Sequence, residues 1–307
     1  MTLQDALADA NSMEKPVEIW VAQGTYRPDQ GSGVTPGDTK ATFRLINGVT
    51  IRGGYAGLGQ PDPNAWDPNE YETILYGDLQ GNDDFEDRTT LSDNSLHIVT
   101  SIGLDETAVL EGVTIAHGAF LGTFFFDEEN PPQGGAGLYN ESGSPEIRRC
   151  VFVDNYIRFG DGAAVFNDAQ SAARFDRCTF ANSRNGEAMA NYESHCILRE
   201  CRFIDNLSHA IVLKEATCEL DGCLFRGNKQ VAIRMYDESR AMMSGCVFRT
   251  NKGGIYGGQV ECKGCVFEQN ASEWGGGIYV DQASLVDCLF RDNSGVQVGA
   301  VGATSSL

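Results

Sequence analysis

A run of acidic and amide side chains between Gly77 and Asn94 contains the residue types best suited to binding a metal ion. Calcium is held by about six to eight oxygen ligands from carboxylates, amides and carbonyls. The spacing does not match the calcium loop of an EF-hand, so two interpretations stay open. The run is either a solvated acidic turn or a calcium site, whose ligands would be Asp78, Asp83, Asp84 and Asp87.

A second set of residues suits the binding of carbohydrate. Aromatic side chains recur one position after a repeated apolar residue, where we expect them to face outward from a strand. Rings in a row on a sheet can stack on sugar rings, and nearby carboxylates can accept hydrogen bonds from hydroxyl groups. Alternatively, the rings only cover their neighbours beneath a loop, and Ala190 and Val212 interrupt the row. The candidate glycan-binding residues are Tyr139, Phe166, Arg234, Tyr256, Tyr279, Asp168 and Asp281.

The sequence shows no complete catalytic constellation. Glycoside hydrolysis needs two carboxyl groups at a set separation, but Asn182 separates the equivalent turn residues Asp154 and Asp205. Elimination or epimerisation of a uronic acid needs a base and a cationic or calcium site. The side chains that could serve are scattered along the chain, so we assign no catalytic residue; they are His117, His195, His209, Arg158 and Lys214.

The ten cysteines favour buried thiols over a metal site or disulfides. Seven of them recur in a Cys-x-Phe phrase, and the other three fall on positions expected to face inward, where a thiol behaves as a small apolar side chain. A disulfide between Cys196 and Cys218 is one alternative. Zinc at Cys262-x-x-Cys265 is another, but no second ligand pair completes that site.

The Cys-x-Phe phrase is the repeat that must position all these residues. Its copies start 28, 23, 22, 23, 19 and 23 residues apart, and they begin at Cys150, Cys178, Cys201, Cys223, Cys246, Cys265 and Cys288. A period in the low twenties indicates a solenoid. The apolar positions within each copy alternate as in short strands, and they leave no room for a helix of ten or more residues.

We therefore predict an all-β fold, a right-handed parallel β-helix with coils of about 22 residues. Coils that stack at the spacing of paired strands place like residues on like, so Phe stacks on Phe. An asparagine three residues after the Phe is expected to face inward and bind the turn backbone. These residues are Asn155, Asn206, Asn228, Asn251, Asn270 and Asn293, whereas Ser183 occupies that position in the second copy.

One continuous core implies a single domain over residues 1–307. Residues 1–16 are expected to form an N-terminal cap, in which Thr2 and Asp5 make a capping box on a short amphipathic helix. Residues 17–133 form early coils with long loops, and residues 134–307 form the regular coils. No capping pattern follows Asn293, which leaves end-to-end self-association through an uncapped C-terminal coil as an expectation.

The phrases GGAGLYN and GGGIYV, each followed by F-x-x-N, resemble the GGA(I/L/V) and FxxN repeats of polymorphic outer-membrane proteins. The whole chain resembles bacterial secreted β-helix proteins of the pectin-lyase-like superfamily. That resemblance implies a secreted or cell-surface scaffold or adhesin-like module, which contacts a polysaccharide or cell-surface glycan along the aromatic row. The alternative that it implies is a polysaccharide lyase, hydrolase or uronate epimerase, with a site built from loops 56–94 and 119–133.

The amino-acid composition argues against some classes of binding partner. The formal charge of −20 and the pI near 4.5 argue against nucleic acid and anionic membrane surfaces. No apolar run is long enough to span a membrane. The first residues carry no leader pattern, so the expected extracellular or cell-surface location comes from the resemblance, with the leader peptide absent from this sequence.

Overall fold

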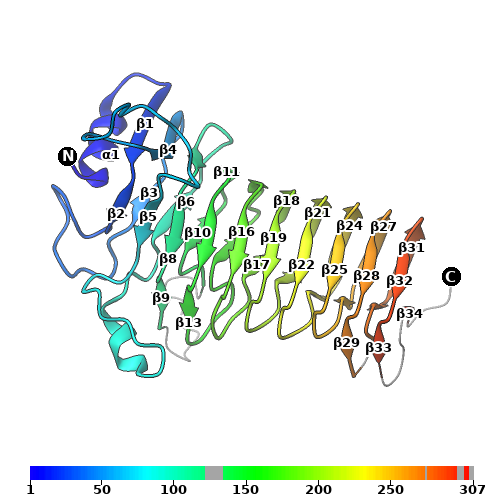
Figure 1. Cartoon of the computed structure of the whole chain (residues 1–307). Helices are drawn as coiled ribbons and strands as arrows, with labels where there is room; N and C mark the ends of the chain where they lie inside the picture. Colours follow the sequence, from blue (N-terminus) through cyan, green and yellow to red (C-terminus); the bar gives the residue numbers. More distant parts are fainter. Residues whose placement is uncertain (122–133, 274, 296–300, 304–307) are drawn as a thin grey trace.

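The computed structural model describes residues 1–121, 134–273, 275–295 and 301–303, and it confirms the predicted right-handed parallel β-helix (Figure 1). Three parallel sheets of ten strands form the walls of the solenoid. Sheet A comprises β1 (Val17–Ala22), β4 (Val49–Tyr55), β7 (Val109–Glu111), β11 (Glu146–Arg148), β15 (Arg174–Asp176), β18 (His195–Arg199), β21 (Thr217–Asp221), β24 (Arg240–Ser244), β27 (Gln259–Lys263) and β31 (Gln282–Val286).

The other two walls run beside it, with one strand from each coil. Sheet B comprises β2 (Gly24–Tyr26), β5 (Thr73–Tyr76), β8 (Thr114–Ala116), β12 (Val151–Val153), β16 (Thr179–Ala181), β19 (Arg202–Ile204), β22 (Leu224–Arg226), β25 (Val247–Arg249), β28 (Val266–Glu268) and β32 (Leu289–Arg291). Sheet C comprises β3 (Phe43–Arg44), β6 (Val99–Ile102), β10 (Leu138–Glu141), β14 (Val165–Asp168), β17 (Met189–Tyr192), β20 (Ile211–Lys214), β23 (Ile233–Tyr236), β26 (Ile255–Tyr256), β30 (Ile278–Val280) and β34 (Val301–Ala303).

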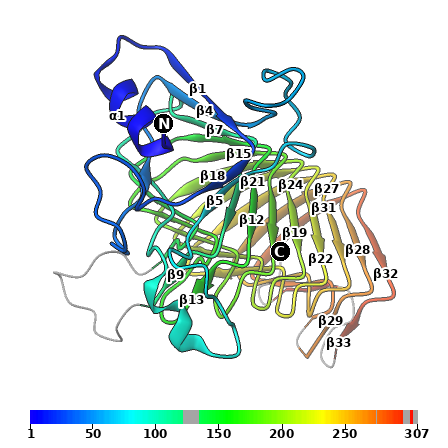
Figure 2. The same cartoon turned by 60° about the vertical axis from the view of Figure 1, so that its left-hand side comes forward.

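Shorter elements complete the fold. Two small sheets extend the corner between sheets B and C, and a 3-10 helix, η1 (Arg88–Asp93), lies in one of the long loops. Figure 2 shows η1 and loop 56–71 projecting from opposite sides of the solenoid. The small sheets pair β9 (Ala119–Phe120) with β13 (Tyr156–Ile157), and β29 (Ala271–Ser272) with β33 (Ser294–Gly295).

The predicted cap covers the N-terminal coil. Helix α1 (Leu3–Ser12) begins with a complete capping box, because Thr2 and Asp5 each accept a hydrogen bond from the other's backbone N–H. Leu3, Leu7 and Ala10 are buried against the first coil, which closes the apolar end of the core. The expected association through the other end involves residues 296–300 and 304–307, which lie outside the described residues.

The interior consists of ladders of identical side chains, as predicted. Phe152 begins a stack of seven phenylalanines in sheet B, in which successive ring centres lie 4.6–5.0 Å apart. At the following corner each coil turns through a residue with positive φ, such as Asp154 or Asp205, and then places its asparagine inward. Ser183 stands in the ladder without an amide and donates its N–H to Asn206 Oδ1 at 3.0 Å.

The thiols are inward as predicted, and all ten are free. Cys178 and its neighbours stack along the corner between sheets A and B, where each thiol donates to backbone carbonyl oxygens. Burial raises the pKa of the Cys178 thiol, which opposes formation of a reactive thiolate.

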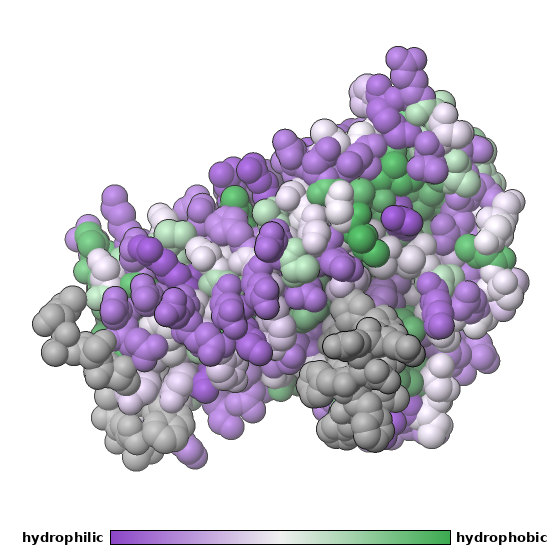
Figure 3. Space-filling view, turned by 180° about the vertical axis from the view of Figure 1, so that it is seen from behind, coloured by the Kyte–Doolittle hydropathy of each residue, from purple (hydrophilic) through white to green (hydrophobic). Residues whose placement is uncertain are grey.

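The surface shown in Figure 3 is mainly hydrophilic along the coils, and apolar side chains gather there toward the N-terminal end.

Candidate functional site

The candidate glycan-binding row lies on the outward face of sheet C in the predicted register. Tyr139 pairs with Phe166, and that column continues through Arg234, Tyr256 and Tyr279 on later strands. Each strand therefore contributes one outward side chain at the inter-strand spacing of roughly 4.8 Å. Exposure of these side chains divides the row into two parts.

The rings in the first part of the row are buried. Tyr139 is only 4% exposed and Phe166 only 5%, so neither ring can stack on a sugar. Their rings lie 6.2 Å apart, Tyr139 also packs on His97 at 5.2 Å, and Tyr192 meets Phe166 edge-on at 5.2 Å. The side chains that cover the two rings, His97 and Tyr192, do not belong to the repeated positions, so the repeat does not predict them. For this half of the row, these contacts favour the alternative in which the rings only cover one another.

The second part of the row stays partly exposed and is joined by neighbours from the next outward column. We call this surface the tyrosine–cation patch, and it consists of Lys214, Arg234, Tyr236, Tyr256 and Tyr279. Arg234 Cζ lies 3.9 Å from the centre of the Tyr256 ring and 4.9 Å from that of Tyr236. The rings of Tyr256 and Tyr279 lie 5.3 Å apart. Stacking between rings holds the guanidinium group in a fixed position.

The two acids predicted for the row lie on either side of this patch. Asp168 is half-buried beside Glu141, and burial is the main reason that its pKa lies above the usual range. Asp281 is exposed, and its Oδ2 accepts a hydrogen bond from the Gly258 N–H at 3.2 Å. The structure therefore does not bring Asp168 and Asp281 together, and only Asp281 lies beside Tyr279.

Two carboxyl groups lie next to the patch, on the segments that lead into strands β14 and β17 of sheet C. The spacing of the repeat does not predict that they lie together. Asp161 and Glu187 come from adjacent coils, and the charge of Asp161 acts on the carboxyl group of Glu187. The Tyr192 hydroxyl donates to Asp161 Oδ2. Gly162 permits this approach, because its φ is +67° and a Cβ there would lie 2.2 Å from Val165 O.

Burial and the Asp161 charge raise the pKa of Glu187 to about 7. Glu187 is therefore mostly protonated below pH 7, and its Oε2 is buried without a hydrogen bond. Nearby, burial lowers the pKa of His209, whose Nδ1 lies 3.0 Å from Val231 O. The cluster thus holds a neutral carboxylic acid next to a carboxylate, which is the arrangement that general acid–base chemistry uses.

Spacing alone does not pair Asp161 with Glu187. Asp161 precedes its ladder residue Val165 by four positions, whereas Glu187 precedes Met189 by only two. The coil between them is irregular, so an alignment on the repeat places the two acids out of register. A search for acidic residues within four positions before the first residue of each strand of sheet C would have found both.

Replacement of Glu187 by glutamine is expected to remove a pH dependence of stability. The raised pKa means that the protonated form favours the folded chain, so this stabilisation is complete below about pH 4.5 and is lost as the pH rises through 7. The loss is on the order of 3 kcal/mol. Urea unfolding measured from pH 5 to pH 8 should show falling stability for the wild type and a flatter profile for Glu187→Gln.

The exposed carboxyl group of Glu193, on the same coil, provides the matched control. Glu193→Gln should keep the wild-type pH profile. Identical profiles for the wild type and Glu187→Gln would contradict the raised pKa of the buried Glu187.

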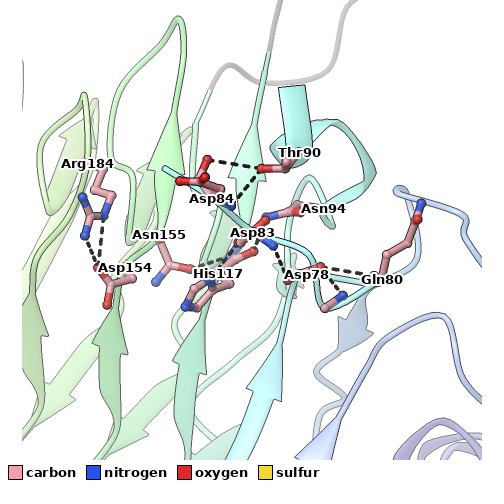
Figure 4. A network of polar contacts seen from close by, with 12 residues as sticks. Asp78, Gln80, Asp83, Asp84, Thr90, Asn94, His117, Asp154, Asn155 and Arg184 are labelled. Atoms are coloured by element: carbon pink, nitrogen blue, oxygen red, sulfur yellow. Dashed lines mark hydrogen bonds and ion pairs between the residues drawn. The ribbon is translucent and has the colours of Figure 1, made fainter. Parts of the chain in front are cut away.

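The acidic loop folds onto the corner of the coils at His117 (Figure 4). Asp83 Oδ2 lies 2.6 Å from His117 Nδ1 and accepts from Asn94 Nδ2 at 3.0 Å. The imidazole ring packs against the rings of Tyr76 at 4.9 Å and Phe85 at 5.5 Å. These contacts anchor the loop to sheet B.

The four predicted calcium ligands hold turns of this loop and do not converge. Asp78 accepts hydrogen bonds from the backbone N–H groups of Gly81 and Asp83. The carboxylate of Asp83 is in turn paired with His117 Nδ1. Asp84 and Asp87 accept the N–H groups of Glu86 and Thr89, respectively. In the described part of the chain, no group of three or more His, Cys, Asp or Glu side chains could hold a metal ion. Calcium binding stays a prediction that would require these carboxylates to change partners.

The histidines and other acids lie on different faces, as expected from their scatter. His195 lies on sheet A with its Nε2 3.6 Å from Glu219, whereas His117 and His209 lie at corners. Asp154 is paired with Arg184, whose Nη2 lies 2.9 Å from Asp154 Oδ1.

No described helix is long and apolar enough to cross a membrane.

Comparison with known proteins concerns the fold. Residues 163–307 match a family described as right handed beta helix region, which covers slightly under half of the chain. The match is to β-helices in general, so the resemblance to polymorphic outer-membrane repeats stays an expectation. No curated protein matches the chain.

Several solved structures are similar at low identity. The catalytic unit of a GH87 α-1,3-glucanase from Streptomyces thermodiastaticus is 13% identical, with a TM-score of 0.41; the similarity covers 97% of this chain but only 61% of the glucanase unit. The A-module of a mannuronan C-5 epimerase from Azotobacter vinelandii is also 13% identical (TM-score 0.38, 99% of this chain, 93% of that chain). A surface adhesin of Streptococcus pneumoniae is 12% identical (TM-score 0.31, 96% and 87%). Likeness at this level concerns the fold and carries no argument about activity. The family match and the three parallel sheets agree on a right-handed parallel β-helix.

Proposed function

We infer that the protein is an extracellular or cell-surface β-helix module that binds an acidic polysaccharide at the tyrosine–cation patch. The carrying observation is that Lys214 and Arg234 have no carboxylate partner among the described residues, in a chain with 43 acidic and 23 basic side chains. Several other arginines are paired with carboxylates, for example Arg177 with Glu200 at 2.8 Å. Unpaired cations within an acidic surface mark a place where an anionic ligand can bind.

The geometry of the patch suits a sugar acid. Arg234 Nε is buried without a hydrogen-bond partner, so a carboxylate that reached it would satisfy a donor that already lacks water. Lys214 comes from the adjacent strand in register with Tyr236, whose ring is 44% exposed. A sugar ring can stack on a tyrosine while its carboxylate binds a cation beside it. The patch extends over successive strands from β20 to β30, which suits a polymer.

Cleavage of the same polysaccharide is the second candidate function, and the Asp161–Glu187 pair is the observation that favours it. A protonated acid and a carboxylate beside a sugar site are the groups that a hydrolase requires. Hydrolases hold these groups about 5 Å or more apart, so that a sugar carbon or a water fits between them. The strong effect of the Asp161 charge on Glu187 indicates that the two groups lie close to each other and not on either side of a sugar, and we therefore place binding first.

Titration calorimetry with polygalacturonate and alginate tests the binding function. We expect the wild type to bind at least one polyuronate, with an affinity that falls as salt is added. Arg234→Ala should weaken binding about tenfold, because the charged contact is worth about 1.4 kcal/mol or more. Arg226→Ala removes an exposed arginine of sheet B and should bind like the wild type.

Two results would overturn the proposal: no binding of any polyuronate, or equal binding by Arg234→Ala and the wild type. The same samples should be assayed for unsaturated products and for new reducing ends, with and without calcium. Turnover that Glu187→Gln abolishes would move cleavage ahead of binding.

A further inference from the structure

Two tryptophans lie exposed at the N-terminal end of sheet A. Trp20 of β1 is 53% exposed, and its ring stacks on Tyr55 of β4 at 4.7 Å with an interplanar angle of 12°. Trp66 is 39% exposed, forms a bridge to Tyr55, and donates its Nε1–H to Gly53 O at 2.8 Å. Loop 56–71 is thereby fixed to the sheet. We call Trp20, Tyr55 and Trp66 the tryptophan platform.

The charges around the platform neutralise one another. Arg52 contacts Glu18 at 2.7 Å and Glu111 at 3.0 Å, and Glu111 also binds Arg149 at 2.7 Å. Both guanidinium groups face Trp66, at 6.0 Å and 5.7 Å from its ring. Two cations and two carboxylates leave no net charge here, which favours a neutral ligand over an acidic one. The platform differs in this respect from the patch on sheet C.

Beyond the platform, a groove lies on the outward face of sheet A, and one column of side chains leads from the platform to it. Trp20, Arg52, Glu111 and Arg148 occupy one column on successive strands. From Arg148 onward a depression of about 230 Å³ crosses β11, β15 and β18, and a second of about 590 Å³ extends to β31. The two depressions share Ile197 and Arg199, so they form one groove; Figure 2 shows these strands in a row.

The groove is lined by side chains that can bind hydroxyl groups. Its column alternates in charge through Arg148, Asp176, Arg199 and Asp221, which provides donors and acceptors on alternate strands. From Trp20 to Arg199 there are five inter-strand steps of roughly 4.8 Å, about 24 Å in all. This length exceeds a single sugar and fits an extended oligosaccharide.

We propose that the tryptophan platform and this groove form a second binding site, which takes a linear neutral polysaccharide with one sugar stacked on Trp20. The stacked ring contributes apolar contact, and the alternating charges bind hydroxyl groups along the chain. The site shares no residue with the tyrosine–cation patch, so it does not depend on polyuronate binding there.

Intrinsic fluorescence of the full chain tests this site, because Trp20 and Trp66 are two of its three tryptophans. Neutral oligosaccharides of cellulose, mannan and laminarin, from disaccharide to octasaccharide, serve as probes. We expect at least one series to change the emission saturably, with affinity that rises with chain length. Trp20→Ala should weaken binding of the octasaccharide about tenfold, and Trp20→Phe should restore part of it.

Arg199→Ala probes the far part of the site, since this exposed residue lies where the two depressions meet. It should weaken binding of the octasaccharide but not of the disaccharide. Arg234→Ala should leave neutral binding intact, and Trp20→Ala should leave polyuronate binding intact, which separates the two sites. The proposal is overturned if no neutral series binds, or if Trp20→Ala and Arg199→Ala both bind like the wild type.

Discussion

Replacement of Phe225 by alanine is expected to lower the free energy of unfolding by about 4 kcal/mol. The ring is fully buried and lies between Phe203 at 4.9 Å and Phe248 at 4.6 Å, nearly parallel to both. Backbone hydrogen bonds fix the spacing of the coils, so the stack cannot close over the cavity that alanine leaves. Urea unfolding followed by circular dichroism measures the loss.

The position of the damage provides a second measurement. Each coil of a solenoid contacts only its neighbours, so amide exchange should accelerate first in the coils of Phe203 and Phe248. Phe225→Leu keeps most of the volume and should cost about 1.5 kcal/mol or less. Leu207→Ala, at a site that is 47% exposed, should change stability by no more than about 0.5 kcal/mol. A loss below about 1 kcal/mol for Phe225→Ala would contradict the stacked core.

Replacement of Asn251 by alanine is expected to cost about 3 kcal/mol, although it removes only a small polar group. Its Nδ2 donates to Phe225 O and Asn270 Oδ1, both at 3.0 Å. Its Oδ1 accepts from Asn228 at 2.8 Å. The change removes hydrogen bonds from buried groups on both neighbouring coils, including the one that the Asn228 backbone N–H donates to Asn251 Oδ1 at 3.1 Å.

Thermal and urea unfolding of Asn251→Ala should show this loss, with the largest change in exchange rates at the corner between sheets B and C. Asn64→Ala, in the exposed loop 56–71, is the matched control and should be neutral. If Asn251→Ala were as stable as the wild type, the ladder would be only a consequence of the repeat and not a source of stability.

The main features of the fold follow from the sequence because they depend on local pattern and period. Alternating apolar residues at intervals near 22 positions require short strands that stack coil on coil. Phe225 and Asn251 must then lie above their equivalents in the next coil, since hydrogen bonding between strands sets both spacing and register. The capping box of Thr2 and Asp5 is equally local, and α1 forms as expected.

The sites depended on contacts that the period does not specify. Tyr139 and Phe166 point outward as predicted, but residues from irregular coils, including His97 and Tyr192, cover them. The acidic loop has the composition of a calcium site, yet the backbone of its own turns and His117 occupy its carboxylates.

Only the tertiary structure brought Asp161 to Glu187, and Trp20 to Tyr55 and Trp66. The physical reason is the same in each case. Hydrogen bonds between strands determine where every coil residue lies, whereas the paths of irregular loops are determined by packing between residues far apart in the chain. The sequence by itself therefore determined the β-helix, its core and its direction of outward side chains. Tertiary packing decided which of those side chains are covered and which remain free to meet a ligand.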